Sequence, residues 1–271
     1  SISHNRSDPE GTAVQLMHTG SQLAQSGEFP SKSKPIVQEE PVLGPDSENT
    51  ISVSTAEELR SALASAKGGE TIELASGDYG TLDLQTFKTF GIKAVYNEPV
   101  TITSADIGNR ASFSSMTLDG VKNLHFDSIS FKSEYTGAAV WTSPFTIRNS
   151  TNVAVESSLF QGQLASGTGD ATADGFATGK GLVVQNSSAI SIANNEFSTW
   201  HRAMTFSSSS TVAVTGNEIH DVRSDGINFA HVQGVLIENN HIYNFIRSRT
   251  SSDHADMIQF WTSGGTVPST D

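Results

Sequence analysis

The second half of the chain repeats one pattern of apolar and polar positions. Residues 189–197, 211–219 and 234–242 follow a common template, in which apolar residues alternate with polar ones before an Asn. The offsets are 22 residues (211 − 189) and 23 residues (234 − 211). A period of this length with strand-like alternation is typical of a β-solenoid, because each unit can bury its apolar face only against its neighbours. Residues 123–131 and 152–160 also fit, so five coils are predicted.

A second strand is predicted in each coil, with apolar residues at positions i and i+2 pointing inward and the residue between them pointing outward. It recurs at 145–147, 182–184, 204–206, 227–229 and 258–260. The turn after this strand is short and polar in every coil. The connection before it varies from six residues (198–203) to twenty-one (161–181). Because functional residues gather on loops carried by a rigid scaffold, the site is expected at this variable corner.

One polar position of the template is Asn195, Asn217 and Asn240 in successive coils. Stacked at one bend, the three amides can bond side chain to side chain along the coil. The sequence therefore predicts an asparagine ladder.

The N-terminal part of the chain has a different character. Residues 1–50 hold five of the eight prolines and little apolar periodicity, and they are expected to form a disordered leader or linker. Ser54 and Glu57 then form a capping-box pattern before an apolar stripe, which predicts a short helix that covers the end of the solenoid. The solenoid is expected to span 51–271, and the lack of a closing pattern after 258–260 favours a C-terminal truncation.

Composition excludes some classes of partner. The formal net charge is −13 and the isoelectric point is about 4.9, which argues against nucleic acid as a partner. No apolar run approaches the roughly 18 residues of a membrane span. The chain has no cysteine, so it offers no disulfide framework.

Several N-terminal motifs resemble the start of secreted parallel β-helices. The motifs at 54–59, 69–74, 77–79 and 100–103 are most similar to the chondroitinase B and alginate lyase family, and the later repeats resemble those of mannuronan C5-epimerases. The resemblance implies an all-β, single-stranded right-handed parallel β-helix. It also implies a polysaccharide substrate, an extracellular or periplasmic location, and Ca²⁺ as a candidate cofactor. The oligomeric state stays open.

A polar column lies two positions before each second strand and reads Ser143, Lys180, Arg202, Asp225 and Asp256. Stacked coils bring neighbours in such a column to about 4.8 Å from one another. The candidate catalytic residues are Lys180, Arg202, Asp225, His254 and Asp256. The candidate substrate-binding residues near the same corner are His201, Arg223, Asn228, His231, Gln259 and Trp261.

These residue types fit β-elimination from a uronic acid, which needs a neutralised carboxylate, a base for the C5 proton and a proton for the leaving oxygen. Lys180, Arg202, Asn228 or Gln259 could neutralise the carboxylate. His254 or His201 could act as the base. A C5-epimerase needs nearly the same groups.

The chain departs from the lyase family at one point, and two alternative functions and the metal stay open. The lyase family's Lys and Arg positions fall near Asn186 and Ser207 here, so its catalytic pair does not carry over. A glycoside hydrolase could use Asp225 and Asp256 as acid and base, and a non-catalytic carbohydrate-binding β-helix would need neither. A metal could bind in the cluster 253–256 or in the loop 162–179, but the metal is unknown.

Overall fold

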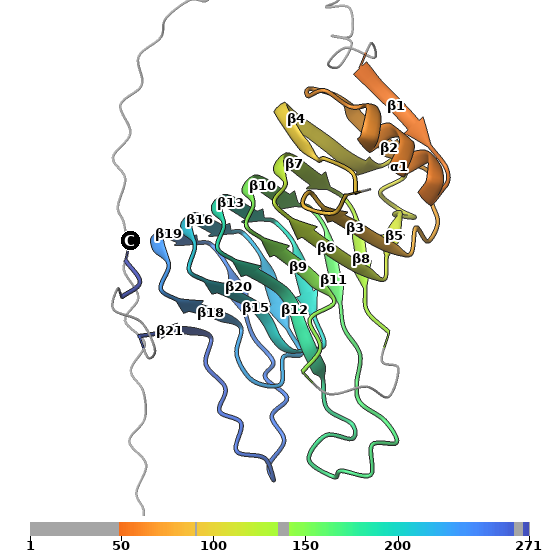
Figure 1. The fold of residues 1–271 in the computed structure, drawn as a ribbon. Helices are drawn as coiled ribbons and strands as arrows, with labels where there is room; N and C mark the ends of the chain where they lie inside the picture. Colours follow the sequence, from red (N-terminus) through yellow and green to blue (C-terminus); the bar gives the residue numbers. More distant parts are fainter. Residues whose placement is uncertain (1–48, 90, 135–140, 263–267, 271) are drawn as a thin grey trace, which may run out of the picture. The chain divides into compact units, whose positions relative to one another are not determined.

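The repeated apolar pattern folds into three parallel sheets that wind around one core (Figure 1). The structure is a computed structural model that describes residues 49–89, 91–134, 141–262 and 268–270. The predicted leader lies outside the described residues except for its last two positions, and Thr50 already belongs to the first strand. Residues 45–271 form one compact unit, and the β-helix occupies its described part.

The first sheet contains the template strands. In order, these are β1 (Thr50–Val53), β2 (Thr71–Leu74), β4 (Val95–Ser104), β7 (Lys122–Asp127), β10 (Thr151–Glu156), β13 (Ser188–Ala193), β16 (Ser210–Thr215) and β19 (Gln233–Glu238). Every pairing between neighbours is parallel, and Val153, Ile190, Val212 and Val235 lie in one inward column. The sequence repeat therefore corresponds to one full coil.

The second sheet is a feature that the sequence pattern did not separate from the first. Its strands are β5 (Ser112–Phe113), β8 (Ser130–Lys132), β11 (Leu159–Gln161), β14 (Glu196–Ser198), β17 (Glu218–His220) and β20 (His241–Ile242). The template's last residues belong to these short strands because the chain bends at the preceding Asn or Ser. At this bend Asn194 and Gly216 have φ angles of +55° and +65°, a region that Asn and Gly tolerate best.

The third sheet contains the predicted second strands. It consists of β3 (Thr81–Gln85), β6 (Ser115–Asp119), β9 (Phe145–Arg148), β12 (Thr178–Gln185), β15 (Trp200–Ser207), β18 (Ile227–Ala230) and β21 (Ile258–Trp261). The chain passes through the first, second and third sheets in turn and then begins the next coil. The short polar turns follow the third sheet, and the long loops enter it, as predicted.

Stacked aromatic rings fill much of the core. Phe160 lies between Phe131 and Phe197, with ring centroids 4.5 Å and 4.3 Å apart. Phe229 lies between Phe206 and Phe260 at 5.1 Å and 4.9 Å. Because the same residue type returns at each coil, apolar side chains stack on their own kind and exclude water without disulfides.

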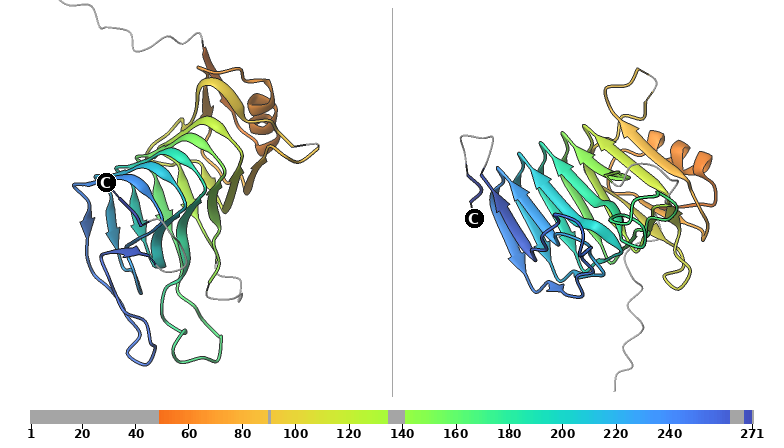
Figure 2. Two further views of the ribbon diagram at one scale, coloured as in Figure 1. Left: turned by 60° about the vertical axis from the view of Figure 1, so that its left-hand side comes forward. Right: turned by 90° about the horizontal axis from the view of Figure 1, so that it is seen from below.

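The helix α1 (Ala56–Ser65) lies at the N-terminal end of the coil (Figure 2). Its buried Leu59 and Leu63 join the core. The capping box lies one residue later than predicted: Thr55 Oγ1 accepts from Glu58 N at 3.2 Å, and Glu58 Oε2 accepts from Ser54 N at 2.7 Å. No helix in the described part of the chain is long and apolar enough to cross a membrane.

The predicted asparagine ladder is present, with Asn195 and Asn217 buried and Asn240 half-buried. Asn195 Nδ2 donates to Asn217 Oδ1 at 3.1 Å, and Asn217 Nδ2 donates to Asn240 Oδ1 at 2.9 Å. Asn217 Oδ1 also accepts from the backbone N–H of Asn195 at 3.0 Å. Each amide therefore joins its own bend to the bend of the next coil.

We expect Asn217→Ala to lower the free energy of unfolding by about 1–3 kcal/mol, because it leaves the buried Asn195 N–H without an acceptor. The matched control is Asn109→Ala at an exposed position, which should change stability by no more than about 0.5 kcal/mol. Urea unfolding of both variants measures the difference. Equal unfolding midpoints would show that the ladder does not stabilise the coil.

Candidate functional site

The predicted polar column forms at the start of the strands of the third sheet. Lys180 on β12 is paired with Arg202 on β15. The same register continues through β18 and β21, which places Asp225 and Asp256 next in the column. Gly226 N donates to Asp256 O at 2.9 Å and holds the last two coils together there. The backbone register is therefore as predicted, whereas the side chains take different environments.

Asp225 is the buried centre of the cluster. Its side chain has no exposed surface, and its Oδ2 lies 3.0 Å from Arg202 Nε. The N–H of Arg202 Nε makes no hydrogen bond to this oxygen, so the contact is an ion pair. Asn228 Nδ2 donates to the same oxygen at 3.1 Å. Asp225 is therefore placed to hold Arg202 and has no exposed surface of its own, and its catalytic role stays a prediction.

His254 lies at the solvent side of this cluster. Its side chain is 58% exposed, and its Nδ1 lies 3.1 Å from Asp256 Oδ2 and 3.9 Å from Asp225 Oδ1. A carboxylate beside Nδ1 favours the tautomer that carries its proton there, which leaves Nε2 as a proton acceptor. The exposed imidazole could therefore accept a proton at Nε2, with Asp256 holding Nδ1.

Two cations, Lys180 and Arg202, lie on neighbouring strands of the same column. Burial, followed by the charge of Arg202, lowers the pKa of Lys180. Arg202 is 24% exposed, and its guanidinium carbon lies 5.8 Å from the centre of the Trp141 ring. Such a contact restrains the guanidinium through cation–π attraction. The two side chains concentrate positive charge at the entry of β12 and β15, although the whole chain is acidic.

A second, buried layer supports the site. Arg223 Nε donates to Asp253 Oδ2 at 2.7 Å, and His201 Nε2 lies 3.4 Å from Asp253 Oδ1. His201 and Arg223 are only 1% and 5% exposed. Burial lowers the pKa of His201 to about 4 although the Asp253 carboxylate raises it. His201 and Arg223 are thus buried against Asp253, and the base role of His201 and the substrate-binding roles of both residues stay predictions.

Stability should depend on pH through His201. Its pKa is about 4 in the folded protein and about 6.5 in an unfolded chain. Between these values the unfolded state binds more protons, so stability is complete above pH 6.5 and falls as the pH drops toward 4. We expect a loss of at most about 3 kcal/mol over this range.

The measurement is urea unfolding across this pH range for the wild type and for His201→Gln, which should flatten the dependence. His241→Gln is the control: it removes an exposed histidine from the second sheet and should leave the pH dependence of stability unchanged. An unchanged pH dependence in His201→Gln would exclude His201 as the cause.

The remaining predicted binding residues divide into two groups. Asn228 is buried and donates to Gln259 Oε1 at 3.0 Å, so Asn228 supports the column, and the half-buried Gln259 lies beside it on β21. His231 follows β18, and Trp261 ends β21. Both lie at the opposite end of their strands from Asp225 and Asp256. Four strand residues span about 13 Å, so they do not join the site.

Aromatic residues in the loops complete the site and were not predicted. Trp141 covers His201, with ring centroids 4.3 Å apart, and the ring of Phe176 lies 5.6 Å from the Arg223 guanidinium carbon. Phe176 belongs to the loop 162–177, and Asp253 and His254 belong to the loop 243–257. Both loops extend from the same side of the coil (Figures 1 and 2). The sequence offers one signal for these two residues, an aromatic side chain in a loop of variable length. Because the loops do not follow the repeat, that signal does not show which residues each ring contacts.

The cluster also contains atoms that could chelate a cation. Among the described residues, ligand atoms of Asp225, His254 and Asp256 lie within 4.8 Å of one another. One nitrogen and two carboxylates suit zinc or manganese better than calcium, which takes six to eight oxygens. Arg202 already faces Asp225 and opposes a cation there. The ligand set therefore gives the calcium expectation no support at this cluster.

The loop 162–179 also carries candidate calcium ligands, Asp170 and Asp174. Their carboxylates accept hydrogen bonds from Thr172 and Thr168 of the same loop. These bonds fold the loop upon itself and occupy oxygens that a calcium ion would need.

A family model described as a right handed beta helix region matches residues 172–253, in agreement with the predicted handedness. No curated protein matches the chain significantly. Three solved structures are similar at a distance. An alginate lyase from Paenibacillus sp. str. FPU-7 has 18% identity and a TM-score of 0.42, covering 77% of this chain and 74% of the lyase.

The pectate lyase Pel9A has 15% identity and a TM-score of 0.39, covering 76% of this chain and 57% of that protein. The pectate lyase Bsp165PelA from Bacillus sp. N165, in complex with trigalacturonate, has 10% identity and a TM-score of 0.40, covering 82% and 80%. The chain is thus a right-handed parallel β-helix with distant structural similarity to polysaccharide lyases.

Proposed function

We propose that the protein acts on a uronate-containing polysaccharide, as a lyase or a C5-epimerase, outside the cell or in the periplasm. The observation that carries the proposal is the column that brings Lys180 and Arg202, on paired strands, together with Asp256, two coils from Arg202 and three from Lys180, and with the His254 that Asp256 holds. The first pair supplies positive charge, and the second supplies an oriented base. Proton abstraction next to a carboxylate needs both.

Arg202 is the group proposed to hold the uronate carboxylate. Its Nε lies 3.0 Å from Asp225 Oδ2 in an ion pair, which holds the guanidinium near Asp225 by charge and leaves its outer N–H groups to form a paired contact with a second carboxylate. Neutralising that carboxylate lowers the cost of the negative charge that develops when the C5 proton leaves. Asp225 is thereby a positioning residue for Arg202.

His254 and Lys180 are proposed to move the protons. Nε2 of His254 takes the C5 proton, the electron pair forms the C4–C5 double bond, and the bond from C4 to the glycosidic oxygen breaks. The leaving oxygen takes a proton from Lys180, whose lowered pKa makes its ammonium group a better acid. In epimerisation the C4–O bond stays, and the proton returns to the other face of C5.

The hydrolase alternative has less support. It needs two carboxyl groups on either side of a glycosidic bond, and Asp225 is completely buried and paired with Arg202. A carbohydrate-binding role without catalysis remains the alternative of another class, and the Trp141 ring, 54% exposed, would serve it as a stacking surface.

Incubation with alginate, pectate and chondroitin sulfate tests the proposal. A lyase produces an unsaturated uronate that absorbs in the ultraviolet, and an epimerase in heavy water exchanges the C5 proton for deuterium without cleavage. New reducing ends without ultraviolet absorbance would indicate a hydrolase instead. Neither double bond nor exchange on any uronate polymer would contradict the proposal.

A further inference from the structure

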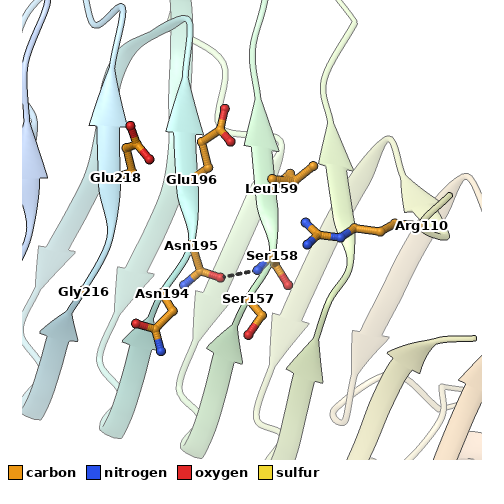
Figure 3. Close-up of a pocket in the computed structure, with 9 residues that line it drawn as sticks. All are labelled: Arg110, Ser157, Ser158, Leu159, Asn194, Asn195, Glu196, Gly216 and Glu218. Carbon is orange, nitrogen blue, oxygen red and sulfur yellow. Dashed lines mark hydrogen bonds between the residues drawn. The ribbon is translucent and has the colours of Figure 1, made fainter. Parts of the chain in front are cut away.

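A polar pocket of about 300 Å³ lies at the bend between the first and second sheets, apart from the candidate functional site. It is lined by Arg110, which precedes β5, and by the bends that lead into β11, β14 and β17. Figure 3 shows the guanidinium of Arg110 pointing toward Ser158, and Glu196 and Glu218 side by side further along the coil. None of the residues proposed for catalysis lines this pocket.

Arg110 forms the cationic end of the pocket. Its Nε and Nη1 atoms are buried, and no residue in the described part of the chain accepts a hydrogen bond from them. A neighbouring pocket of about 330 Å³ shares Arg110 and adds Lys132 and Ser130, and Ser130 Oγ is likewise buried without a partner. Unsatisfied buried donors are costly, most of all on a charged group. The forked guanidinium best satisfies them with a carboxylate.

Two carboxylates form the opposite end. Glu196 on β14 is paired in register with Glu218 on β17, and Leu159 occupies the same column one coil nearer to Arg110. Glu218 is thus about 10 Å from the Leu159 position, twice the spacing of neighbouring strands. Glu196 Oε1 lies near His220 Nε2, and Glu218 Oε1 accepts from Tyr243. The second oxygen of each carboxylate can accept a hydrogen bond from a ligand hydroxyl.

The floor between the two ends is rigid and polar. Asn195 Oδ1 accepts from Ser158 N at 2.9 Å, and the same amide joins the ladder through Asn217. Asn194 can lie against the next coil because Gly216 has no side chain: a Cβ there would come within 2.4 Å of Asn194 Oδ1. The pocket is therefore formed before any ligand arrives, which lowers the entropic cost of binding.

We propose that this pocket binds an acidic saccharide, with its carboxylate on Arg110 and its hydroxyl groups on Glu196, Glu218 and the amide floor. A simple anion would be attracted by Arg110 but repelled by the glutamates. A simple cation would be attracted by the glutamates but repelled by Arg110. A hydroxylated carboxylate satisfies both ends. The choice of a uronate as the acidic sugar rests on the proposed function, whereas the pocket and its polarity do not.

Such a pocket would serve as a second point of attachment for the polymer, on a different sheet from the candidate catalytic residues. Two attachment points on one rigid coil raise the effective concentration of polymer at the second point. The pocket should therefore increase affinity for long chains more than for short ones.

Calorimetry with trigalacturonate and trimannuronate, and with neutral maltotriose as the control ligand, tests the proposal. The protein carries Arg202→Ala, so that binding at the candidate catalytic site is weakened and the probe is not consumed. Arg110→Gln in that background should weaken binding of a uronate trimer at least tenfold. Arg148→Gln, which removes the same charge from the exposed end of β9, should leave it unchanged.

The glutamates separate the proposed ligand from a simple anion. Glu196→Gln with Glu218→Gln should weaken binding of the trimer several-fold, because hydroxyl contacts lose charge assistance. Tighter binding in this double variant would show an anion site only and overturn the proposal. The proposal would also be overturned if adding Arg110→Gln left trimer affinity the same as in Arg202→Ala alone. The same holds if the Arg202→Ala protein bound neither trimer. If trimer binding depends on Arg110 but no polymer is cleaved or epimerised, the proposed function fails and this inference stands.

Discussion

His254→Ala should lower kcat on the uronate polymer by about 10²- to 10⁴-fold, the usual effect of losing a general base. His254 is the exposed imidazole of the cluster, with Nδ1 held at 3.1 Å from Asp256, so its removal leaves no oriented acceptor for the C5 proton. Because the side chain is 58% exposed, stability should change little. Initial rates with saturating polymer, together with a thermal unfolding curve, measure the two effects separately.

His241→Ala provides the matched control, since it removes an exposed histidine from β20 and should keep the full rate. Asp256→Asn should lower kcat about tenfold or more while leaving KM nearly unchanged, because it weakens orientation of the base and not the contact with substrate. Wild-type turnover in His254→Ala would remove His254 from the mechanism.

Asp253→Ala should produce the largest loss of stability, about 3–5 kcal/mol. The carboxylate accepts from Arg223 Nε at 2.7 Å and from Ser251 Oγ at 2.6 Å, and Arg223 is 5% exposed. Removing one partner of a buried pair leaves the other charge without compensation, which is more costly than never having buried the pair. The loop that carries His254 should also lose the contacts that Asp253 makes with His201 on β15 and with Arg223 in the turn before β18.

Urea unfolding and limited proteolysis measure these two consequences. Asp106→Ala, at an exposed position in another loop, should change stability by less than about 1 kcal/mol. Asp253→Asn keeps the shape of the side chain but not its charge. Its loss of stability should lie between those of Asp253→Ala and Asp106→Ala. A loss below 1 kcal/mol in Asp253→Ala would show that water reaches Arg223 and that the buried layer does not hold the loop.

The two expected effects, loss of rate in His254→Ala and loss of stability in Asp253→Ala, correspond to two layers of the site. The outer groups, Lys180, Arg202 and His254, are partly or largely exposed and available to a polymer. Behind them, Asp225 and Asp253 each compensate an arginine at 3.0 Å or less. The buried carboxylates therefore act on the chemistry only through the side chains that they position.

The sequence by itself determined the coil. Its apolar residues return every 22 or 23 positions, and inward side chains can be buried only if successive coils stack in register. That register placed Lys180 beside Arg202 and carried the column on to Asp225 and Asp256, and the asparagine ladder followed from the same periodicity. The capping-box pattern and the apolar stripe after it predicted the capping helix, and the resemblance to secreted β-helices predicted the handedness.

Only the tertiary structure decided which polar side chains are buried and which are exposed. The loops 162–177 and 243–257 have no period, so nothing local in them predicts that Asp253 meets Arg223 and His201, or that Phe176 and Trp141 cover those side chains. Likewise, a column shows which residues are neighbours but not which way each side chain turns. Burial and pairing depend on contacts between residues far apart in the chain, and these exist only once the coils have stacked and the loops have folded against them.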